Sequence, residues 1–298
     1  MSSFRSQTIQ LKDHRILAYC EYGATEGTPI FYAHGGPGSR LEGLFFHKEA
    51  QKQGFRLICM DRPGMGCSTF QKNRTLLDYP KDVIALADHL QIDQFGVLGF
   101  SGGGAHATVC AYAIPHRLLF NISCAGYTNF AELPQAADLL HSKADRLAVR
   151  LAQKKSPFFI FFFYLLYLSI RYFPTYFFST FQKSISPVDQ KAVTNPSIQK
   201  QFLENQKEAM RQKAKGVALD AAIHYQDWGF RLEEISMEVI IFHGSEDRLV
   251  PLEYAKHLKQ NIPNATLHIL ENQGHLFPLQ LQALIFETAR KKIKQPPK

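Results

Sequence analysis

The sequence predicts an α/β fold in which a mostly parallel sheet is covered by helices on both faces. In the first third of the chain, short apolar β-rich runs alternate with runs whose apolar residues recur at helical spacing. The alternation resumes over residues 236–298, whereas residues 127–235 have an irregular helical pattern. Because parallel neighbours need a crossover connection, which is usually a helix, this alternation predicts a parallel sheet interrupted by one helical insertion.

The predicted elements can be placed in order along the chain. A hairpin is expected first, with its strands at residues 8–11 and 16–22. The later strands are expected at residues 30–33, 55–60, 95–100, 119–124, 237–243 and 266–270. Helices are expected at residues 75–90, 102–113, 251–261 and 279–293. We therefore predict a core made of residues 1–126 and 236–298, and an insertion of residues 127–235 at the C-terminal edge of the sheet.

Composition and charge limit the partners. A chain of 298 residues, of which 45% are hydrophobic, can bury one large core. The formal charge of +8 is scattered, so we interpret it as solvated surface charge, with weak attraction to an anionic membrane surface as the alternative. No nucleic-acid motif accompanies the charge, and we expect no nucleic-acid partner.

The cysteines and the N-terminus bear on localisation. The five cysteines are odd in number and form neither a CxxC pair nor a metal-type cluster, which indicates free thiols in a reducing compartment. Residues 1–10 are polar and lack the apolar stretch of a secretory signal. We expect a cytoplasmic protein without a metal or an organic cofactor.

The candidate nucleophile is Ser101, in the segment G-F-S-G-G at residues 99–103. This G-x-S-x-G segment follows a β-rich run and opens a helix of small residues, so the serine would sit on a sharp strand-to-helix turn above the sheet edge. The alternatives are a glycine-rich junction without chemistry and a phosphate-binding loop. No Walker lysine follows the glycines, which argues against the phosphate loop.

A serine hydroxyl needs a base, and the base needs an acceptor that holds its tautomer. His275 follows the last predicted strand, so it would lie at the same sheet edge as Ser101. Asp247 follows the preceding strand and completes the chain order Ser, Asp, His. We prefer Asp247 to its neighbour Glu246. The predicted triad is therefore Ser101, Asp247 and His275.

Two backbone amides are predicted to bind the developing oxyanion. Gly102, directly after the nucleophile, should supply one N–H group. The second should come from the glycine-rich loop H-G-G-P-G-S at residues 34–39, which follows a predicted strand. Gly36 is the first choice and Gly35 the alternative. In a second loop, D-R-P-G-M-G-C-S, we interpret Asp61 and Arg62 as structural residues that tie loops together.

Together these motifs resemble those of the α/β-hydrolase superfamily, across residues 1–126 and 236–298. The resemblance implies an eight-stranded sheet and a cap domain inserted after the sixth strand. The loops H-G-G-P-G-S and D-R-P-G-M-G-C-S resemble those of the proline iminopeptidase and general esterase branches. Iminopeptidases usually carry Trp after the serine, whereas this chain has Gly102, which argues against a peptidase. Dehalogenases and epoxide hydrolases of this fold use an aspartate nucleophile, and position 101 is serine.

Residues 157–181 form an unusually aromatic segment, with the sequence P-F-F-I-F-F-F-Y-L-L-Y-L-S-I-R-Y-F-P-T-Y-F-F-S-T-F. Its uninterrupted apolar part is too short to span about 30 Å of hydrocarbon. A single crossing there would also place Ser101 and His275 on opposite sides of a membrane. Three interpretations remain open: a helix packed on the core, an apolar wall over the active site, and a patch for peripheral membrane contact or dimerisation.

The predicted function is hydrolysis of a carboxylic ester, with a hydrophobic acyl or alcohol part, through an acyl-enzyme on Ser101. The first alternative is an iminopeptidase-like aminopeptidase. It would need an acidic group for the substrate amine, for which Glu132, Glu204 and Glu208 are candidates. The second alternative is a non-catalytic binding protein on the same fold.

Overall fold

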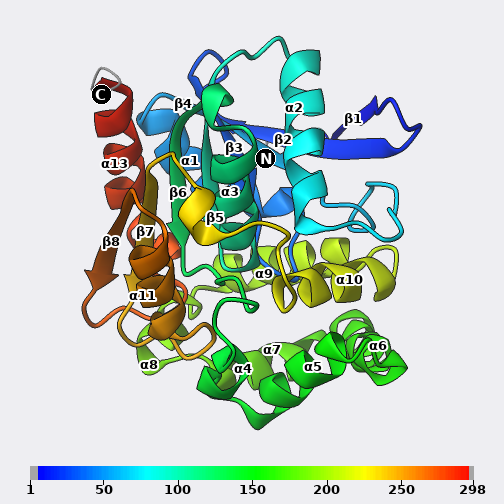
Figure 1. Ribbon diagram of the computed structural model, residues 1–298. Helices are drawn as coiled ribbons and strands as arrows, with labels where there is room; N and C mark the ends of the chain where they lie inside the picture. The colour runs from blue at the N-terminus through cyan, green and yellow to red at the C-terminus, as the bar shows by residue number, and fades with distance from the viewer. Residues whose placement is uncertain (1–5, 295–298) are drawn as a thin grey trace.

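The computed structural model describes residues 6–294, and an eight-stranded sheet forms its centre (Figure 1). The strand order is β1-β2-β4-β3-β5-β6-β7-β8. β1 pairs with β2, and β2 with β4, in antiparallel fashion, and all later pairs are parallel. The predicted mostly parallel sheet is therefore confirmed. The strands are β1 (Gln7–Gln10), β2 (Ile16–Gly23), β3 (Thr28–Ala33), β4 (Phe55–Met60), β5 (Phe95–Phe100), β6 (Leu118–Cys124), β7 (Val239–Gly244) and β8 (Ala265–Leu270).

Helices cover both faces of the sheet, because successive strand residues point to opposite sides. Phe31 of β3 packs into the cluster that includes α2, α3 and α11, whereas its neighbours Ile30 and Tyr32 pack into the cluster that includes α1, α12 and α13. These helices are α1 (His47–Lys52), α2 (Tyr79–His89), α3 (Gly102–Ala113), α11 (Leu252–Asn261), α12 (Phe277–Gln280) and α13 (Gln282–Lys294). The central strands β3 to β7 are thus buried on two sides, which explains their continuous apolar character, whereas the edge strands β1 and β8 are partly exposed.

Differences from the predicted elements are small and lie at their ends. The strand expected at residues 237–243 begins at Val239, the first residue of that run to pair with β8. Two helical stretches of the core were not predicted: a short 3-10 helix at Pro115–Arg117, and a longer 3-10 helix at Arg40–Phe46 that continues into α1. The longer helix follows the glycine-rich loop and contains Gly43, so the sequence there lacks a clear helical period.

The insertion, residues 127–235, lies between β6 and β7. Its helices are α4 (Ala136–Leu139), α5 (Lys143–Gln153), α6 (Pro157–Tyr172), α7 (Pro174–Ser184), α8 (Pro187–Ala192), α9 (Pro196–Ala209) and α10 (Lys215–His224). Figure 1 shows α9 and α10 next to the sheet and α4 to α7 in a layer farther away. The insertion therefore has an inner and an outer layer.

Two prolines determine where the aromatic helices begin. Pro157 occupies the first turn of α6, after the N-cap Ser156, whose side chain accepts a hydrogen bond from the amide of Phe158. Pro174 begins α7, and the two helices meet at an angle of 118°. No single helix in residues 6–294 has the length and apolar composition to cross a membrane, although the bent pair α6 and α7 meets that criterion when taken together.

Candidate active site

Ser101 lies on the turn between β5 and α3 in a strained backbone conformation. Its φ is 53° and its ψ is −122°, a region that residues with a side chain rarely adopt. Its amide donates a hydrogen bond of 2.9 Å to the carbonyl oxygen of Cys124 on β6. The side chain is 9% exposed. The turn therefore presents a mostly buried hydroxyl above the C-terminal edge of the sheet, as the G-x-S-x-G segment predicts.

The two outer glycines of this segment are required by packing. A Cβ at Gly99 would collide with the carbonyl oxygen of Gly103 across the turn. A Cβ at Gly103 would collide with the carbonyl oxygen of Ala33 at the end of β3. Any side chain at either position would push α3 away from the sheet and displace Ser101.

Asp247 and His275 lie side by side in the loops after β7 and β8. The Nδ1 atom of His275 lies 2.7 Å from Oδ2 of Asp247. The other carboxylate oxygen accepts the backbone amides of Leu249 and Val250 at 2.8 and 2.9 Å. Glu246 is exposed. The structure thus brings the preferred acid, and not its neighbour, to the histidine.

The two side chains stabilise each other's charged forms. Burial acts to raise the pKa of Asp247, but the charge of His275 and hydrogen bonds from His243 and His275 lower it below its ordinary value. Burial acts to lower the pKa of His275, but the charge and hydrogen bond of Asp247 raise it. An ionised Asp247 can only accept, so Nδ1 carries the proton and Nε2 is left free to take one.

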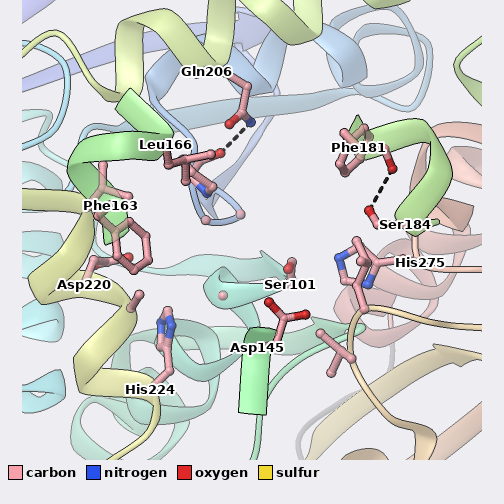
Figure 2. A pocket seen from close by; sticks show the side chains of 18 of the residues that line it. Ser101, Asp145, Phe163, Leu166, Phe181, Ser184, Gln206, Asp220, His224 and His275 are labelled. Atoms are coloured by element: carbon pink, nitrogen blue, oxygen red, sulfur yellow. Dashed lines mark hydrogen bonds between the residues drawn. The ribbon is translucent and has the colours of Figure 1, made fainter. Parts of the chain in front are cut away.

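Ser101 and His275 line the same cavity (Figure 2). Their side chains are not hydrogen-bonded to each other in the described structure. Catalytic hydrogen bonds of this kind often form only when substrate binds. The arrangement allows a base and a nucleophile to act on one bound group.

The two predicted oxyanion donors also lie close together. Gly102 begins α3, so its amide has no partner within the helix. A Cβ at Gly102 would lie 3.5 Å from the backbone nitrogen of Gly36. The amide of Gly35, the alternative oxyanion donor, already donates a hydrogen bond of 2.7 Å to Oε1 of Glu42. It is therefore not free to bind an oxyanion. This geometry favours Gly36 and Gly102.

Helix α9 of the insertion holds the glycine-rich loop. Asn205 accepts the amide of Ser39 through Oδ1 at 3.0 Å and donates through Nδ2 to Glu42 at 3.0 Å. Gln206 donates through Nε2 to the carbonyl oxygen of Pro37 at 2.7 Å. Both residues were missed at the level of sequence, because nothing local in a polar helix indicates which loop it will contact.

Helix α8 holds the histidine loop in a similar way. The carboxylate of Asp189 accepts the backbone amides of His275 and Leu276 at 2.8 and 2.7 Å. Asp189 is fully buried. In the sequence, Asp189 stands three residues after Ser186, the N-cap of α8, and an acidic residue at this position is typical of helix capping. Its contact with the loop could not be read from that pattern.

Arg62 ties loops together, as expected. Its guanidinium donates to both carboxylate oxygens of Asp220 on α10 and to the carbonyl oxygens of His34 and Gly35. Arg74 adds a second ion pair to Asp220 at 2.6 Å. The loop that carries the candidate oxyanion donor is thus joined to α10 by a buried network of charges.

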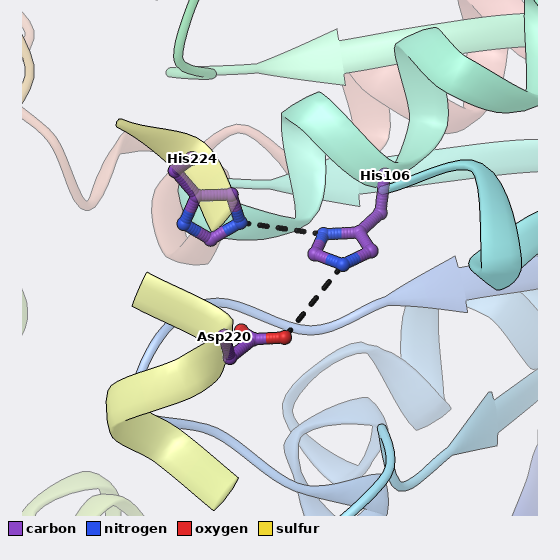
Figure 3. A group of neighbouring side chains, drawn as sticks. All are labelled: His106, Asp220 and His224. Carbon is purple, nitrogen blue, oxygen red and sulfur yellow. Dashed lines mark hydrogen bonds and ion pairs between the residues drawn. The ribbon is translucent and has the colours of Figure 1, made fainter. Parts of the chain in front are cut away.

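Two buried histidines lie next to this network (Figure 3). Nδ1 of His106 lies 3.1 Å from the carbonyl oxygen of Gly102, and Nε2 of His224 lies 3.5 Å from Nδ1 of His106. Burial lowers the pKa of His224 to about 4, so the ring is neutral at neutral pH. His106, His224 and Asp220 have the spacing of metal ligands, but two guanidinium groups already neutralise Asp220. We assign the group to structural support.

The cavity encloses about 460 Å³. On the side of the insertion its walls come largely from α6 and α7, including Phe163, Leu166, Phe177 and Phe181. None of the described residues that line it is Lys or Arg. The apolar-wall interpretation of the aromatic segment is thus consistent with the structure.

Three carboxylates line the cavity. Glu42 and Asp220 are hydrogen-bonded or ion-paired with neighbouring residues, whereas no ion pair of Asp145 is found within residues 6–294. Burial raises the pKa of Asp145, against the effect of a hydrogen bond with Ser142. Figure 2 shows Asp145 among the side chains around the cavity. The possible partners for a substrate amine named from the sequence, Glu132, Glu204 and Glu208, lie outside the lining. Helix order alone does not show which carboxylate faces inward.

Comparison with known proteins agrees with this architecture. Residues 28–280 match the family model for the alpha/beta hydrolase fold. The hydrolase YcgS of Bacillus subtilis is 27% identical over 270 residues, covering 88% of this chain and 90% of that protein. A 2-hydroxy-6-oxononadienedioate/2-hydroxy-6-oxononatrienedioate hydrolase of Pseudomonas putida is 25% identical over 282 residues, covering 91% of this chain and 90% of that protein.

Solved structures show the same fold. An esterase from Exiguobacterium antarcticum has a TM-score of 0.65 and 19% identity, covering 98% of this chain and 100% of that chain. An enol-lactonase from Burkholderia xenovorans has a TM-score of 0.67 and 15% identity, covering 97% and 100% of the two chains. With the family match spanning most of its length, the chain is a hydrolase and belongs to the α/β-hydrolase fold family.

Proposed function

We propose that the chain hydrolyses an uncharged carboxylic ester with a hydrophobic acyl or alcohol part. The observation that carries the proposal is the position of Ser101, on a strained turn, in the same apolar cavity as the His275–Asp247 pair. A nucleophile, a base and an oriented acid are the groups that acyl transfer requires.

The mechanism follows from this placement. The Oγ atom of Ser101 attacks the ester carbonyl carbon while Nε2 of His275 takes the hydroxyl proton. The amides of Gly36 and Gly102 bind the resulting oxyanion, and the ion pair with Asp247 stabilises the imidazolium. His275 then protonates the leaving alcohol. In the deacylation step, His275 takes a proton from water, and the hydroxide attacks the acyl-enzyme and releases the acid and Ser101.

The cavity favours an uncharged substrate over a dianionic one. The name of the Pseudomonas putida relative describes a substrate with two carboxylates. Such a substrate would need cationic partners, and among the described residues the lining of this cavity offers three carboxylates and no Lys or Arg. The aromatic walls favour an acyl chain or another apolar group.

Two further assignments belong to this proposal. Residues 127–235 would act as a cap domain, because the insertion supplies the wall opposite Ser101. The protein would work in the cytoplasm, because all five cysteines are free and four of them are buried, the state favoured by a reducing compartment.

An aminopeptidase is the second candidate, and Asp145 is the observation that favours it. Its carboxylate lies in the cavity and could accept a substrate ammonium group. Against it, the position after the nucleophile is Gly102, where iminopeptidases usually have Trp. A non-catalytic binding protein is disfavoured by the family match, which places the chain among hydrolases.

A fluorophosphonate probe would test the proposed nucleophile. Wild-type protein should form one covalent adduct, mapped to Ser101 by mass spectrometry. The adduct should be absent in Ser101→Ala and form far more slowly in His275→Ala. Ser184→Ala, which removes another hydroxyl from the cavity lining, is the matched control and should react at the wild-type rate. An adduct that forms equally fast without His275 would refute the proposed mechanism.

A further inference from the structure

The outer layer of the insertion exposes an extended apolar surface. Among the residues that the structure describes, fourteen large hydrophobic side chains are exposed, and nine of them lie on α6, α7 and the residue between them. We call these nine the aromatic face: Phe158, Ile160, Phe161, Phe162, Tyr164, Leu165, Tyr172, Phe173 and Tyr176. Tyr172, Phe173 and Tyr176 are 63%, 65% and 71% exposed, values unusual for large aromatic side chains. A concentration of this kind marks an interaction surface.

The charged side chains of residues 143–184 are mostly basic, although one of them, Arg150, is ion-paired with Asp138. Residues 143–184 contain seven basic side chains and one acidic side chain, Asp145, which lines the cavity. The basic residues are Lys143, Arg146, Arg150, Lys154, Lys155, Arg171 and Lys183. Lys154 and Lys155 directly precede α6, and Arg171 lies in its last turn. An aromatic surface with a basic rim fits a partner that has an anionic outer layer and an apolar layer underneath.

We propose that the aromatic face docks on an anionic lipid surface. Phe and Tyr side chains would enter the boundary between headgroups and acyl chains, while the basic rim would contact the lipid headgroups. A second copy of this chain fits less well, because a two-fold contact would place the same basic rim against itself. The 118° angle between α6 and α7 is compatible with a face that lies on the surface and does not cross it.

Docking would also serve the active site. Phe162 and Tyr176 belong to the aromatic face and line the cavity as well, so the cavity reaches the aromatic face between α6 and α7. A lipid-soluble ester could then pass from the membrane to Ser101 without crossing water. This step rests on the ester hydrolysis proposed above, whereas the docking itself does not.

Vesicle binding by the full-length protein tests the docking. The Ser101→Ala protein should co-sediment with vesicles of phosphatidylcholine and phosphatidylglycerol, more weakly with phosphatidylcholine alone, and less at high salt. The variant Phe158→Ser/Phe161→Ser/Phe173→Ser should lose binding, because all three residues belong to the aromatic face. None of them lines the cavity, so the substitutions leave the active site unchanged. Lys154→Gln/Lys155→Gln/Arg171→Gln should bind anionic vesicles about a hundredfold more weakly, at roughly 1 kcal/mol for each basic residue.

Matched controls use equivalent residues elsewhere on the surface. Ile269→Ser/Leu284→Ser removes exposed apolar side chains from β8 and α13, and Lys12→Gln/Lys72→Gln removes exposed charges from the core. Both should bind as wild type does. Equal loss in the controls, or no binding to anionic vesicles by wild type, would overturn the proposal. So would a dimer, detected by sedimentation velocity, that only the Phe158→Ser/Phe161→Ser/Phe173→Ser variant abolishes.

Activity separates this proposal from the proposed function. The aromatic-face variant, in an otherwise wild-type background, should hydrolyse a soluble short-chain p-nitrophenyl ester at the wild-type rate and lose activity on a long-chain ester embedded in anionic vesicles. If the variant lost both activities, circular dichroism and the thermal midpoint would show whether it had misfolded. Loss of both activities in a folded variant would overturn the proposed passage of the ester from the membrane to Ser101. Vesicle binding by a protein that hydrolyses no ester would refute the function alone.

Discussion

The carboxylate of Asp189, on helix α8 of the insertion, accepts the backbone amide of His275 at 2.8 Å. The same carboxylate accepts the amide of Leu276, so one buried side chain of the insertion fixes two consecutive peptide groups of the histidine loop. In addition, its negative charge raises the pKa of His275, although burial acts against that shift. We infer that Asp189 is a positioning residue for the base.

Asp189→Asn should therefore slow catalysis and move its pH dependence. The amide side chain can accept only one of the two backbone bonds, and a lost bond to a charged group amounts to about 1.5–3 kcal/mol. The proposed reaction needs neutral His275, so activity should rise with pH through the pKa of that group. Removal of the Asp189 charge lowers this pKa, and the rising limb of kcat/KM should move to lower pH. A rate loss without a shift of the limb would indicate a purely structural role.

Asp247→Asn should reduce kcat by about four orders of magnitude, because the amide can hold His275 in the wrong tautomer. Glu246→Gln is the matched control: its side chain is exposed, and the variant should retain wild-type activity. Steady-state rates on a short-chain ester measure both effects. If the two variants lost activity equally, the assignment of the acid to Asp247 would be wrong.

His224→Gln should make stability less dependent on pH. The pKa of His224 is about 4 in the folded protein and 6.5 in the reference state, so the unfolded chain binds more protons between these values. Stability should accordingly fall as the pH falls from 6.5 towards 4, by about 1.4 kcal/mol per pH unit for each such histidine. Urea unfolding at pH 7 and pH 5 measures the slope.

His116→Gln, at an exposed position, is the control for that measurement and should leave the slope unchanged. The buried His34 and His106, whose pKa values are also lowered by burial, should continue to make the protein less stable at pH 5 in both variants. An unchanged slope in His224→Gln would show that this ring is not a neutral group of low pKa.

Asp145→Asn should distinguish the two candidate activities. For an ester substrate the substitution removes a negative charge from a largely apolar cavity, and kcat/KM should stay the same or increase. For an aminoacyl amide, loss of the partner for the ammonium group should raise KM at least tenfold. Assay of both substrate types with both proteins would decide between an esterase and an aminopeptidase.

The sequence was sufficient to predict the sheet, because its central strands are buried on both faces and therefore appear as apolar runs. It also placed Ser101, Asp247 and His275 at the same sheet edge, since each follows a strand. Chain order, however, contains no information on distant contacts such as Asp189 with His275 or Asn205 with Ser39, which are separated by 86 and 166 residues. Those contacts depend on how the insertion folds back over the sheet.

The layering of the insertion has a consequence for how substrate preference can change in evolution. Helices α8 and α9 make the hydrogen bonds that hold the proposed base and the candidate oxyanion loop, so substitutions there would damage every reaction that the proposed site performs. Helices α6 and α7 contribute wall side chains such as Phe181. Related sequences could therefore acquire new substrates by altering the outer helices alone, while the residues that break the bond stay as they are.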